Sequence, residues 1–161
     1  MKPCGESPKV YLNPGELVIC EQPTEVVTVL GSCVAVVFFA RRQRLGAICH
    51  AMLPYHKGED INEFKYVDRS VGYMLEEFRR RRVARSEIVV KLFGGADMFE
   101  PGKASTSGTV GRQNIAAARN LLEGQGLTIS ASDVGGGSGR KIVFCSRTGD
   151  VYLKRMKGQW R

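Results

Sequence analysis

The sequence predicts an α+β fold in which mixed β-sheets carry helices packed on the outside. Segments rich in β-branched and aromatic residues outnumber the two segments with helical periodicity. Strands and helices do not alternate strictly along the chain, which disfavours a doubly wound parallel sheet. The chain has 161 residues, of which 43% are hydrophobic and 25% charged, and both values are typical of one globular domain. We therefore expect a single domain over residues 1–161.

The first half of the chain is predicted to consist of strands. Residues 1–16 are punctuated by proline and glycine, so this segment is expected to be irregular. Short runs of β-branched and aromatic residues follow, bounded by turn residues. They predict strands at residues 17–22, 25–30, 34–40 and 45–53. The third run is continuously apolar and rich in β-branched and aromatic residues, which predicts a buried strand.

The second half is predicted to contain both helices. Apolar side chains recur at helical spacing from Val67 to Phe78, which predicts a helix over residues 67–83 with one buried stripe. Residues 111–126 carry a similar stripe and end in glycines, which commonly terminate helices. Further strands are predicted at residues 87–93, 127–134, 141–145 and 151–156, the last two joined as a hairpin.

The net charge of +8 at pH 7 is concentrated in two arginine clusters, at residues 41–44 and 79–85. Such clusters can contact nucleic-acid phosphates, dock on an acidic protein surface, or form a solvated turn and the basic end of a helix. Neither cluster is interleaved with the aromatic residues that stack on bases, so we expect no nucleic-acid partner. Arg79 and Arg80 remain weak candidates for contact with an acidic partner.

The five cysteines are odd in number and form no C-x-x-C pair; they are Cys4, Cys20, Cys33, Cys49 and Cys145. Disulfide frameworks are typical of short secreted chains with dense, even cysteines, so reduced thiols are expected here. A structural zinc site needs four closely spaced ligands, and no phosphate-binding or dinucleotide motif occurs. We therefore expect neither a metal nor a cofactor.

No segment has the length of a membrane span. The longest apolar run covers residues 33–40, whereas a spanning helix needs about 20 apolar residues. The start of the sequence lacks the apolar core of a secretory signal. These features predict a cytoplasmic protein that does not insert into a membrane.

Cys33 has the most informative surroundings in the sequence. It lies in TVLGSCVAVV, where a predicted strand meets a Gly-Ser turn and the next strand begins. A bend at Gly31 and Ser32 would lift the thiol clear of the backbone, and its N–H groups can form an oxyanion hole. His50 lies on the following predicted strand. Paired strands are about 4.8 Å apart, so a Cys–His contact is within reach.

A cysteine beside a histidine is suited to acyl transfer from an amide, ester or thioester. A free thiol has a pKa of about 8.5, and an adjacent imidazole can take its proton and later protonate a leaving group. Thr28, Ser32 or a backbone carbonyl would hold the imidazole in one tautomer. The alternative is that Cys33 is an ordinary core cysteine, as Cys49 and Cys145 are expected to be.

Ordered segments between about Gly15 and Lys157 carry a family resemblance. They are TVLGSCVAV (28–36), HAMLP (50–54), KLFGGADMF (91–99), GRQNIAAARNLL (111–122), DVGGGSGRKIVF (133–144) and TGDVYLKRM (148–156). Through them the chain resembles the CheD family of chemoreceptor glutamine deamidases. The resemblance implies a catalytic cysteine at Cys33, a histidine base at His50 and a threonine, for which Thr28 is the candidate. It also implies a fold similar to that of cysteine deamidase toxins.

The resemblance implies conversion of specific receptor glutamines to glutamate. The route would be thiolate attack on the carboxamide, loss of ammonia, and hydrolysis of a thioester, and the same chemistry permits receptor methylester hydrolysis. The implied partners are chemoreceptor cytoplasmic domains and a CheC-type phosphatase. Met98 and Phe99 are candidate apolar contacts for a partner. The competing class is a non-catalytic binding module that regulates the phosphatase or the receptor.

Overall fold

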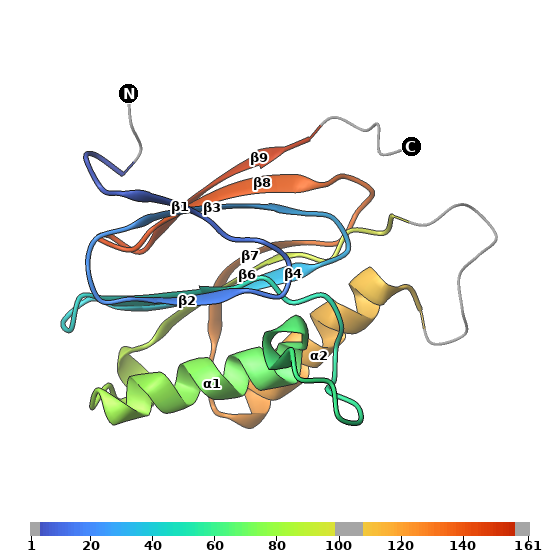
Figure 1. The fold of residues 1–161 in the computed structure, drawn as a ribbon, viewed down its shortest axis with the longest axis horizontal. Helices are drawn as coiled ribbons and strands as arrows, with labels where there is room; N and C mark the ends of the chain where they lie inside the picture. Colours follow the sequence, from blue (N-terminus) through green and yellow to red (C-terminus); the bar gives the residue numbers. More distant parts are fainter. Residues whose placement is uncertain (1–3, 99–107, 157–161) are drawn as a thin grey trace.

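Two β-sheets are stacked on each other, and two helices cover the outer face of one of them. The computed structural model describes residues 4–98 and 108–156. Figure 1 shows the three resulting layers, with α1 (Val67–Arg80) and α2 (Val110–Gly124) beneath the middle sheet. This arrangement confirms the prediction of mixed sheets with helices packed outside.

The two sheets are mixed, since each contains one parallel pair of strands. The four-stranded sheet has the order β1-β3-β8-β9, and β1 pairs parallel with β3. Its strands are β1 (Lys9–Tyr11), β3 (Glu25–Leu30), β8 (Arg140–Cys145) and β9 (Asp150–Arg155). The five-stranded sheet has the order β2-β5-β4-β6-β7, and β6 pairs parallel with β7. Its strands are β2 (Leu17–Cys20), β5 (Leu45–Cys49), β4 (Val34–Ala40), β6 (Val89–Gly94) and β7 (Ile129–Val134).

The structure differs from the predicted elements mainly at their ends. Two short 3₁₀ helices, η1 (Glu63–Lys65) and η2 (Arg85–Glu87), flank α1. Residues 1–16 were expected to be irregular, but Lys9–Tyr11 forms β1 because it pairs in register with the start of β3. The strand predicted over residues 45–53 ends at Cys49, and beyond it isolated bridges join Ala51 to Val34 and Leu53 to Tyr66.

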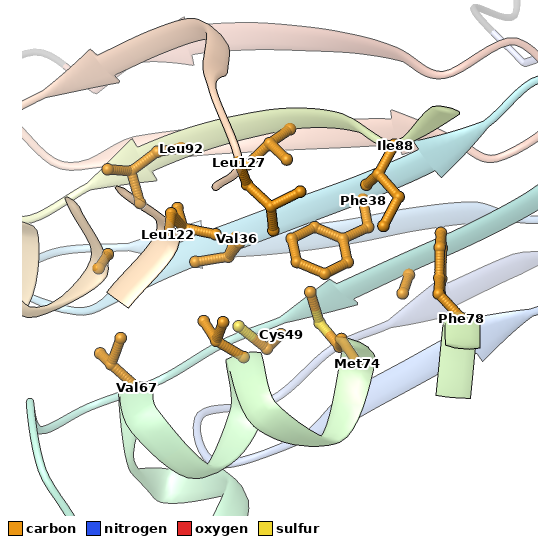
Figure 2. Close-up of a cluster of buried hydrophobic side chains, with 14 of the residues drawn as sticks. Val36, Phe38, Cys49, Val67, Met74, Phe78, Ile88, Leu92, Leu122 and Leu127 are labelled. Atoms are coloured by element: carbon orange, nitrogen blue, oxygen red, sulfur yellow. The ribbon is translucent and has the colours of Figure 1, made fainter. Parts of the chain in front are cut away.

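The core has two layers, one on each face of β4. Val34, Val36, Phe38 and Ala40 face the helices, whereas Ala35 and Val37 face the four-stranded sheet. All residues of β4 are buried, as the continuous apolar run predicted. In the helix-facing layer, the rings of Phe38 and Phe78 meet edge to face with centroids 5.5 Å apart (Figure 2). This packing fixes α1 against the middle sheet.

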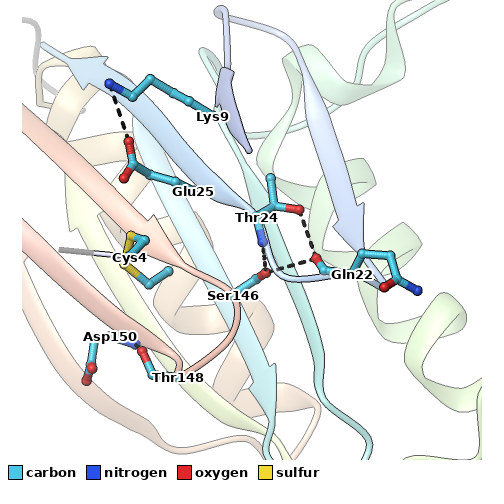
Figure 3. Close-up of a disulfide and its surroundings, with 9 residues drawn as sticks. Cys4, Lys9, Gln22, Thr24, Glu25, Ser146, Thr148 and Asp150 are labelled. Atoms are coloured by element: carbon cyan, nitrogen blue, oxygen red, sulfur yellow. Dashed lines mark hydrogen bonds and ion pairs between the residues drawn. A yellow bond between two sulfur atoms is a disulfide. The ribbon is translucent and has the colours of Figure 1, made fainter. Parts of the chain in front are cut away.

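A disulfide joins Cys4 to Cys145 (Figure 3), so the expectation of five reduced thiols was wrong for these two. The reason lies in the strand register, because Lys9 pairs with Glu25 and Glu25 pairs with Cys145. The chain just before β1 is thereby brought beside the end of β8. The bond closes a loop with a sequence separation of 141 residues. In the chain-entropy model, closing a loop of this size stabilises the fold by about 5 kcal/mol.

None of the helices in the described ranges has the length and apolar character that crossing a membrane requires. Residues 4–98 and 108–156 also contain no group of three or more His, Cys, Asp or Glu side chains that could hold a metal ion.

Candidate active site

Three predicted residues, Thr28, Cys33 and His50, gather at one end of the space between the two sheets. Cys33 directly precedes β4 and His50 directly follows β5. The next residue of each, Val34 and Ala51, exchanges two backbone hydrogen bonds of 3.0 and 2.8 Å. Val34 and Ala51 point toward the helices. Because side chains alternate along extended chain, Cys33 and His50 both point toward the four-stranded sheet.

The His50 imidazole is held by a side chain of the opposite sheet. The Thr28 hydroxyl lies 2.7 Å from Nδ1 of His50 and donates to the Leu12 carbonyl at 2.7 Å. A carbonyl only accepts, so it takes the single hydroxyl proton. Thr28 must then accept from His50, which places the ring proton on Nδ1. Nε2 is left as the unprotonated nitrogen, the form that a general base needs.

The backbone of His50 is fixed by the segment between β1 and β2. The Gly15 N–H donates to the His50 carbonyl at 2.8 Å, and the His50 N–H donates to the Glu16 carbonyl at 2.9 Å. Together with the Leu12 carbonyl, this segment determines where the imidazole lies and which nitrogen carries the proton. This role of residues 12–16 was not predicted, because backbone carbonyls and N–H groups have no signature in a sequence.

His50 and Cys33 differ in their access to solvent. The His50 side chain is buried, and its Nε2 has no hydrogen-bond partner among the described residues. Cys33 is half-buried, whereas the other two free cysteines, Cys20 and Cys49, are fully buried. No hydrogen bond links Cys33 Sγ to His50 in this structure. Nε2 thus has a free lone pair that is shielded from solvent, whereas the Cys33 thiol is partly accessible.

Burial keeps both groups neutral at rest. It lowers the pKa of His50 to about 4, an effect that the nearby Glu16 carboxylate partly offsets by favouring the imidazolium. Burial also raises the pKa of Cys33, and its own backbone N–H opposes that shift. The resting pair is thus a thiol and a neutral imidazole. Proton transfer between them must accompany attack on a substrate rather than precede it.

In the turn that carries Cys33, the carbonyls of residues 31–33 accept hydrogen bonds from other parts of the protein. The Gly95 N–H donates to the Cys33 carbonyl at 2.8 Å, and the Ala96 N–H donates to the Gly31 carbonyl at 2.9 Å. The Ser32 carbonyl accepts from a buried side-chain amide at 3.0 Å. The N–H groups of Gly31 and Ser32, by contrast, donate no hydrogen bond to any residue in the described ranges. Free N–H groups at a bend are the donors that an oxyanion hole requires.

Glycine at position 94 lets the end of β6 approach this turn. Gly94 has a φ of 102°, which favours glycine, and a Cβ there would collide with the Cys33 carbonyl. The glycine pair in KLFGGADMF therefore supports the turn that carries Cys33.

Among the residues predicted to contact a partner, Met98 lies at the site, whereas Arg79 and Arg80 lie at the end of α1. Met98 is half-buried, and a Cβ on Gly31 would lie 3.7 Å from its side chain, so Met98 lies beside the turn that carries Cys33. Phe99 lies outside the described residues.

Arg79 and Arg80 lie in the last turn of α1, next to Phe78, which packs on Phe38. Phe38 is five positions beyond Cys33 along extended chain, or about 16 Å. Arg79 pairs with Glu76 at 2.6 Å and Arg80 with Glu77 at 2.9 Å. These arginines are therefore partly neutralised and remote from Cys33.

Residues 52–155 match a family model described as CheD chemotactic sensory transduction. This match begins after His50, but full-length relatives cover nearly the whole chain. A protein of Geobacter sulfurreducens named "Probable chemoreceptor glutamine deamidase CheD 2" is 47% identical over 92% of this chain and 91% of its own length. Similarly named proteins of Maridesulfovibrio salexigens and Methanococcus vannielii are 42% and 36% identical, each covering about nine-tenths of both chains.

Proposed function

Because this chain belongs to the CheD family, we propose that it is a chemoreceptor glutamine deamidase that converts specific glutamine side chains to glutamate. The observation that carries the mechanism is the 2.7 Å contact between Thr28 and His50 Nδ1, which leaves Nε2 unprotonated beside the Cys33 turn. Cys33 is the nucleophile, His50 the general base and acid, and Thr28 the residue that orients the imidazole.

The reaction begins with attack of Cys33 Sγ on the carboxamide carbon as His50 Nε2 takes the thiol proton. The carbonyl oxygen becomes an oxyanion, which the N–H groups of Gly31 and Ser32 stabilise by hydrogen bonds. The imidazolium then returns the proton to the amide nitrogen. Ammonia leaves, and the glutamyl side chain is bound to Cys33 as a thioester.

Hydrolysis completes the cycle. The neutral imidazole takes a proton from water as the water oxygen attacks the thioester carbon, and the C–S bond breaks. The sulfur regains its proton from His50, and a glutamate carboxyl is released. A receptor methylester can enter the same route, with methanol leaving in place of ammonia.

The substrate places this reaction at the cytoplasmic domains of chemoreceptors. Their modified regions are exposed helical segments, and Met98 beside the Cys33 turn offers such a segment an apolar contact. We also propose that Phe99 contacts a partner and that a CheC-type phosphatase is one such partner. The proposed location is the cytoplasm, since both the substrate domains and this partner are found there.

The test is intact-mass analysis of a receptor cytoplasmic fragment incubated with the protein. Each deamidation adds about one mass unit, because OH replaces NH₂. We expect wild type and Cys49→Ala to give this shift and release ammonia, and Cys33→Ala to give neither. Cys49 is the matched control because it is also a free cysteine but faces the helices. Full activity in Cys33→Ala would leave only a non-catalytic binding role.

A further inference from the structure

We propose that Asn114 is a positioning residue for the deamidation reaction. Its amide holds two segments at a fixed separation: the turn at residues 31–33, which carries Cys33, and residues 50–52, which begin with His50. The inference rests on the proposed function, since it assigns a role to a residue that does not touch the reacting atoms. Asn114 lies in the second turn of α2 and is fully buried.

The contacts of Asn114 are specific to the two segments that carry the reacting groups. Its Nδ2 donates to the Ser32 carbonyl at 3.0 Å and to the Met52 carbonyl at 3.0 Å. Ser32 directly precedes Cys33, and Met52 is the second residue after His50. Both partners are carbonyls, so the amide nitrogen and not the oxygen must face them. Both protons of one amide group are thus used to join the two segments.

This amide completes a second connection between the same two segments. The first is the pair of backbone hydrogen bonds between Val34 and Ala51. The N–H groups of Gly95 and Ala96 hold the Cys33 and Gly31 carbonyls to the end of β6, but they do not tie this turn to the His50 segment. The Asn114 contact at Ser32 lies on the other side of Cys33 from the Val34 bridge and supplies that second tie. The position of Sγ relative to His50 Nε2 is therefore fixed from both sides of Cys33.

The remaining polar atom of Asn114 argues that packing is not its main role. Its Oδ1 is buried and has no hydrogen-bond partner among the described residues. An unpaired buried acceptor destabilises the fold, and a leucine of similar size would fill the same volume without that cost. What the amide offers and leucine cannot is the pair of donated hydrogen bonds. The fold thus keeps a destabilising unpaired oxygen at Asn114, whose amide nitrogen links the Cys33 segment to the His50 segment.

Close approach of α2 to the Cys33 turn makes these contacts possible. Position 111 has no room for a Cβ, which would collide with the Ala96 carbonyl and come within 2.6 Å of the Gly95 carbonyl. Gly95 and Ala96 are the residues whose N–H groups hold the carbonyls of Cys33 and Gly31. Gly111 therefore brings the first turn of α2 against this support, and Asn114, one helical turn later, reaches Ser32.

The experiment compares Asn114→Ala with Leu122→Ala in deamidation of a receptor cytoplasmic fragment. Leu122 is a buried residue of the same helix that packs in the helix-facing core layer. Its truncation destabilises α2 without touching the two carbonyls. We expect kcat of Asn114→Ala to fall about tenfold to a hundredfold with KM changed less than twofold, because small misplacement of reacting groups costs rate. Leu122→Ala should keep kcat per folded molecule within twofold of wild type.

A second readout is the pH dependence of Cys33 alkylation by iodoacetamide, mapped by peptide mass. At neutral pH the reaction needs His50 to take the thiol proton, so Asn114→Ala should react about tenfold more slowly than wild type. At a pH above the thiol pKa, Cys33 ionises without the base, and the two rates should become equal. A merely structural defect would not show this convergence. If Asn114→Ala does not fold, Asn114→Ser, which retains one donor, should give an intermediate kcat and the same convergence.

The proposal is overturned if Asn114→Ala keeps kcat within twofold of wild type, or if Leu122→Ala loses as much kcat as Asn114→Ala. Equal alkylation rates at neutral pH would also overturn it. Cys33→Ala is assayed in parallel to separate this result from the proposed function. An inactive Cys33→Ala beside an unaffected Asn114→Ala removes only the role of Asn114, whereas an active Cys33→Ala removes the deamidase mechanism itself.

Discussion

The two faces of the five-stranded sheet use similar residues for different purposes. Cys49 faces the helices among Val67 and Met74 (Figure 2), and complete burial raises its pKa to about 11. Its neighbour His50 faces the other way and meets Thr28 of the opposite sheet. The helix-facing layer consists of apolar side chains, whereas the layer between the sheets ends in a polar site. Two consecutive residues at the end of β5 thus place a thiol in the helix-facing core and an imidazole, the proposed base, between the sheets.

The largest effect on deamidation is expected from removing the His50 imidazole. His50→Gln keeps a polar side chain but cannot take the thiol proton, so we expect deamidation to fall at least about a thousandfold. Cys49→Ala, at the adjacent position on the helix-facing side, should lower stability and leave kcat unchanged. Steady-state ammonia release measures both. Comparable kcat losses in the two variants would show that the two faces do not divide these roles.

The buried imidazole also makes stability sensitive to acid. Unfolded histidine binds a proton below about pH 6.5, whereas folded His50 remains neutral until its pKa of about 4. Between these values the unfolded state binds more protons, so the free energy of unfolding decreases as pH falls. The expected loss is about 3 kcal/mol across this window.

Urea unfolding of wild type, His50→Gln and His56→Gln at pH 7 and pH 4.5 checks this effect. His50→Gln should lose less stability on acidification than wild type. His56→Gln is the matched control, because His56 is the chain's other histidine and lies outside the site. An identical pH dependence in wild type and His50→Gln would contradict the burial that the structure assigns to this ring.

A smaller effect is expected from the residue that only orients the base. Thr28→Val removes the hydroxyl but keeps the shape, so the Nδ1 proton loses its acceptor and the wrong tautomer becomes accessible. We expect kcat to fall about tenfold to a hundredfold. Thr28→Ser retains the hydroxyl and should recover most of the activity, as measured by the same ammonia assay. An inactive Thr28→Ser, or a fully active Thr28→Val, would argue against the assigned tautomer.

The smallest effect is expected at two arginines far from Cys33. Reversing the charges of Arg79 and Arg80 removes cations that an acidic receptor helix could contact. Because both are exposed and already paired with Glu76 and Glu77, we expect KM to rise at most about threefold, with kcat unchanged. Assays at low and high salt measure the contribution. An unchanged KM at low salt would remove these arginines from the receptor surface.

Features that follow from the chemistry and spacing of neighbouring side chains could be predicted from the sequence. The apolar run of β4 predicted a buried strand, and a glycine-serine turn before Cys33 drew attention to a free cysteine that is half-buried, unlike Cys20 and Cys49. Residue chemistry left Thr28, Ser32 and a backbone carbonyl as candidates to orient the imidazole, and the family resemblance favoured Thr28.

Features that depend on distant parts of the chain were not predictable. The Leu12 carbonyl sets the tautomer of His50, yet any residue at that position would supply a carbonyl. Cys4 and Cys145 meet only because β1 pairs with β3 and β3 with β8. Asn114 reaches Ser32 across 82 positions of sequence. Such contacts follow from topology, which short-range patterns do not specify.

The most direct test of the mechanism is to trap the covalent intermediate. A receptor fragment is mixed with the protein, quenched in acid within one turnover and analysed by intact mass and peptide mapping. The account predicts an adduct lighter than the sum of the two chains by one ammonia, cleaved by hydroxylamine and attached at Cys33. Deamidated product formed at the wild-type rate by Cys33→Ala, or an adduct attached to another residue, would contradict it.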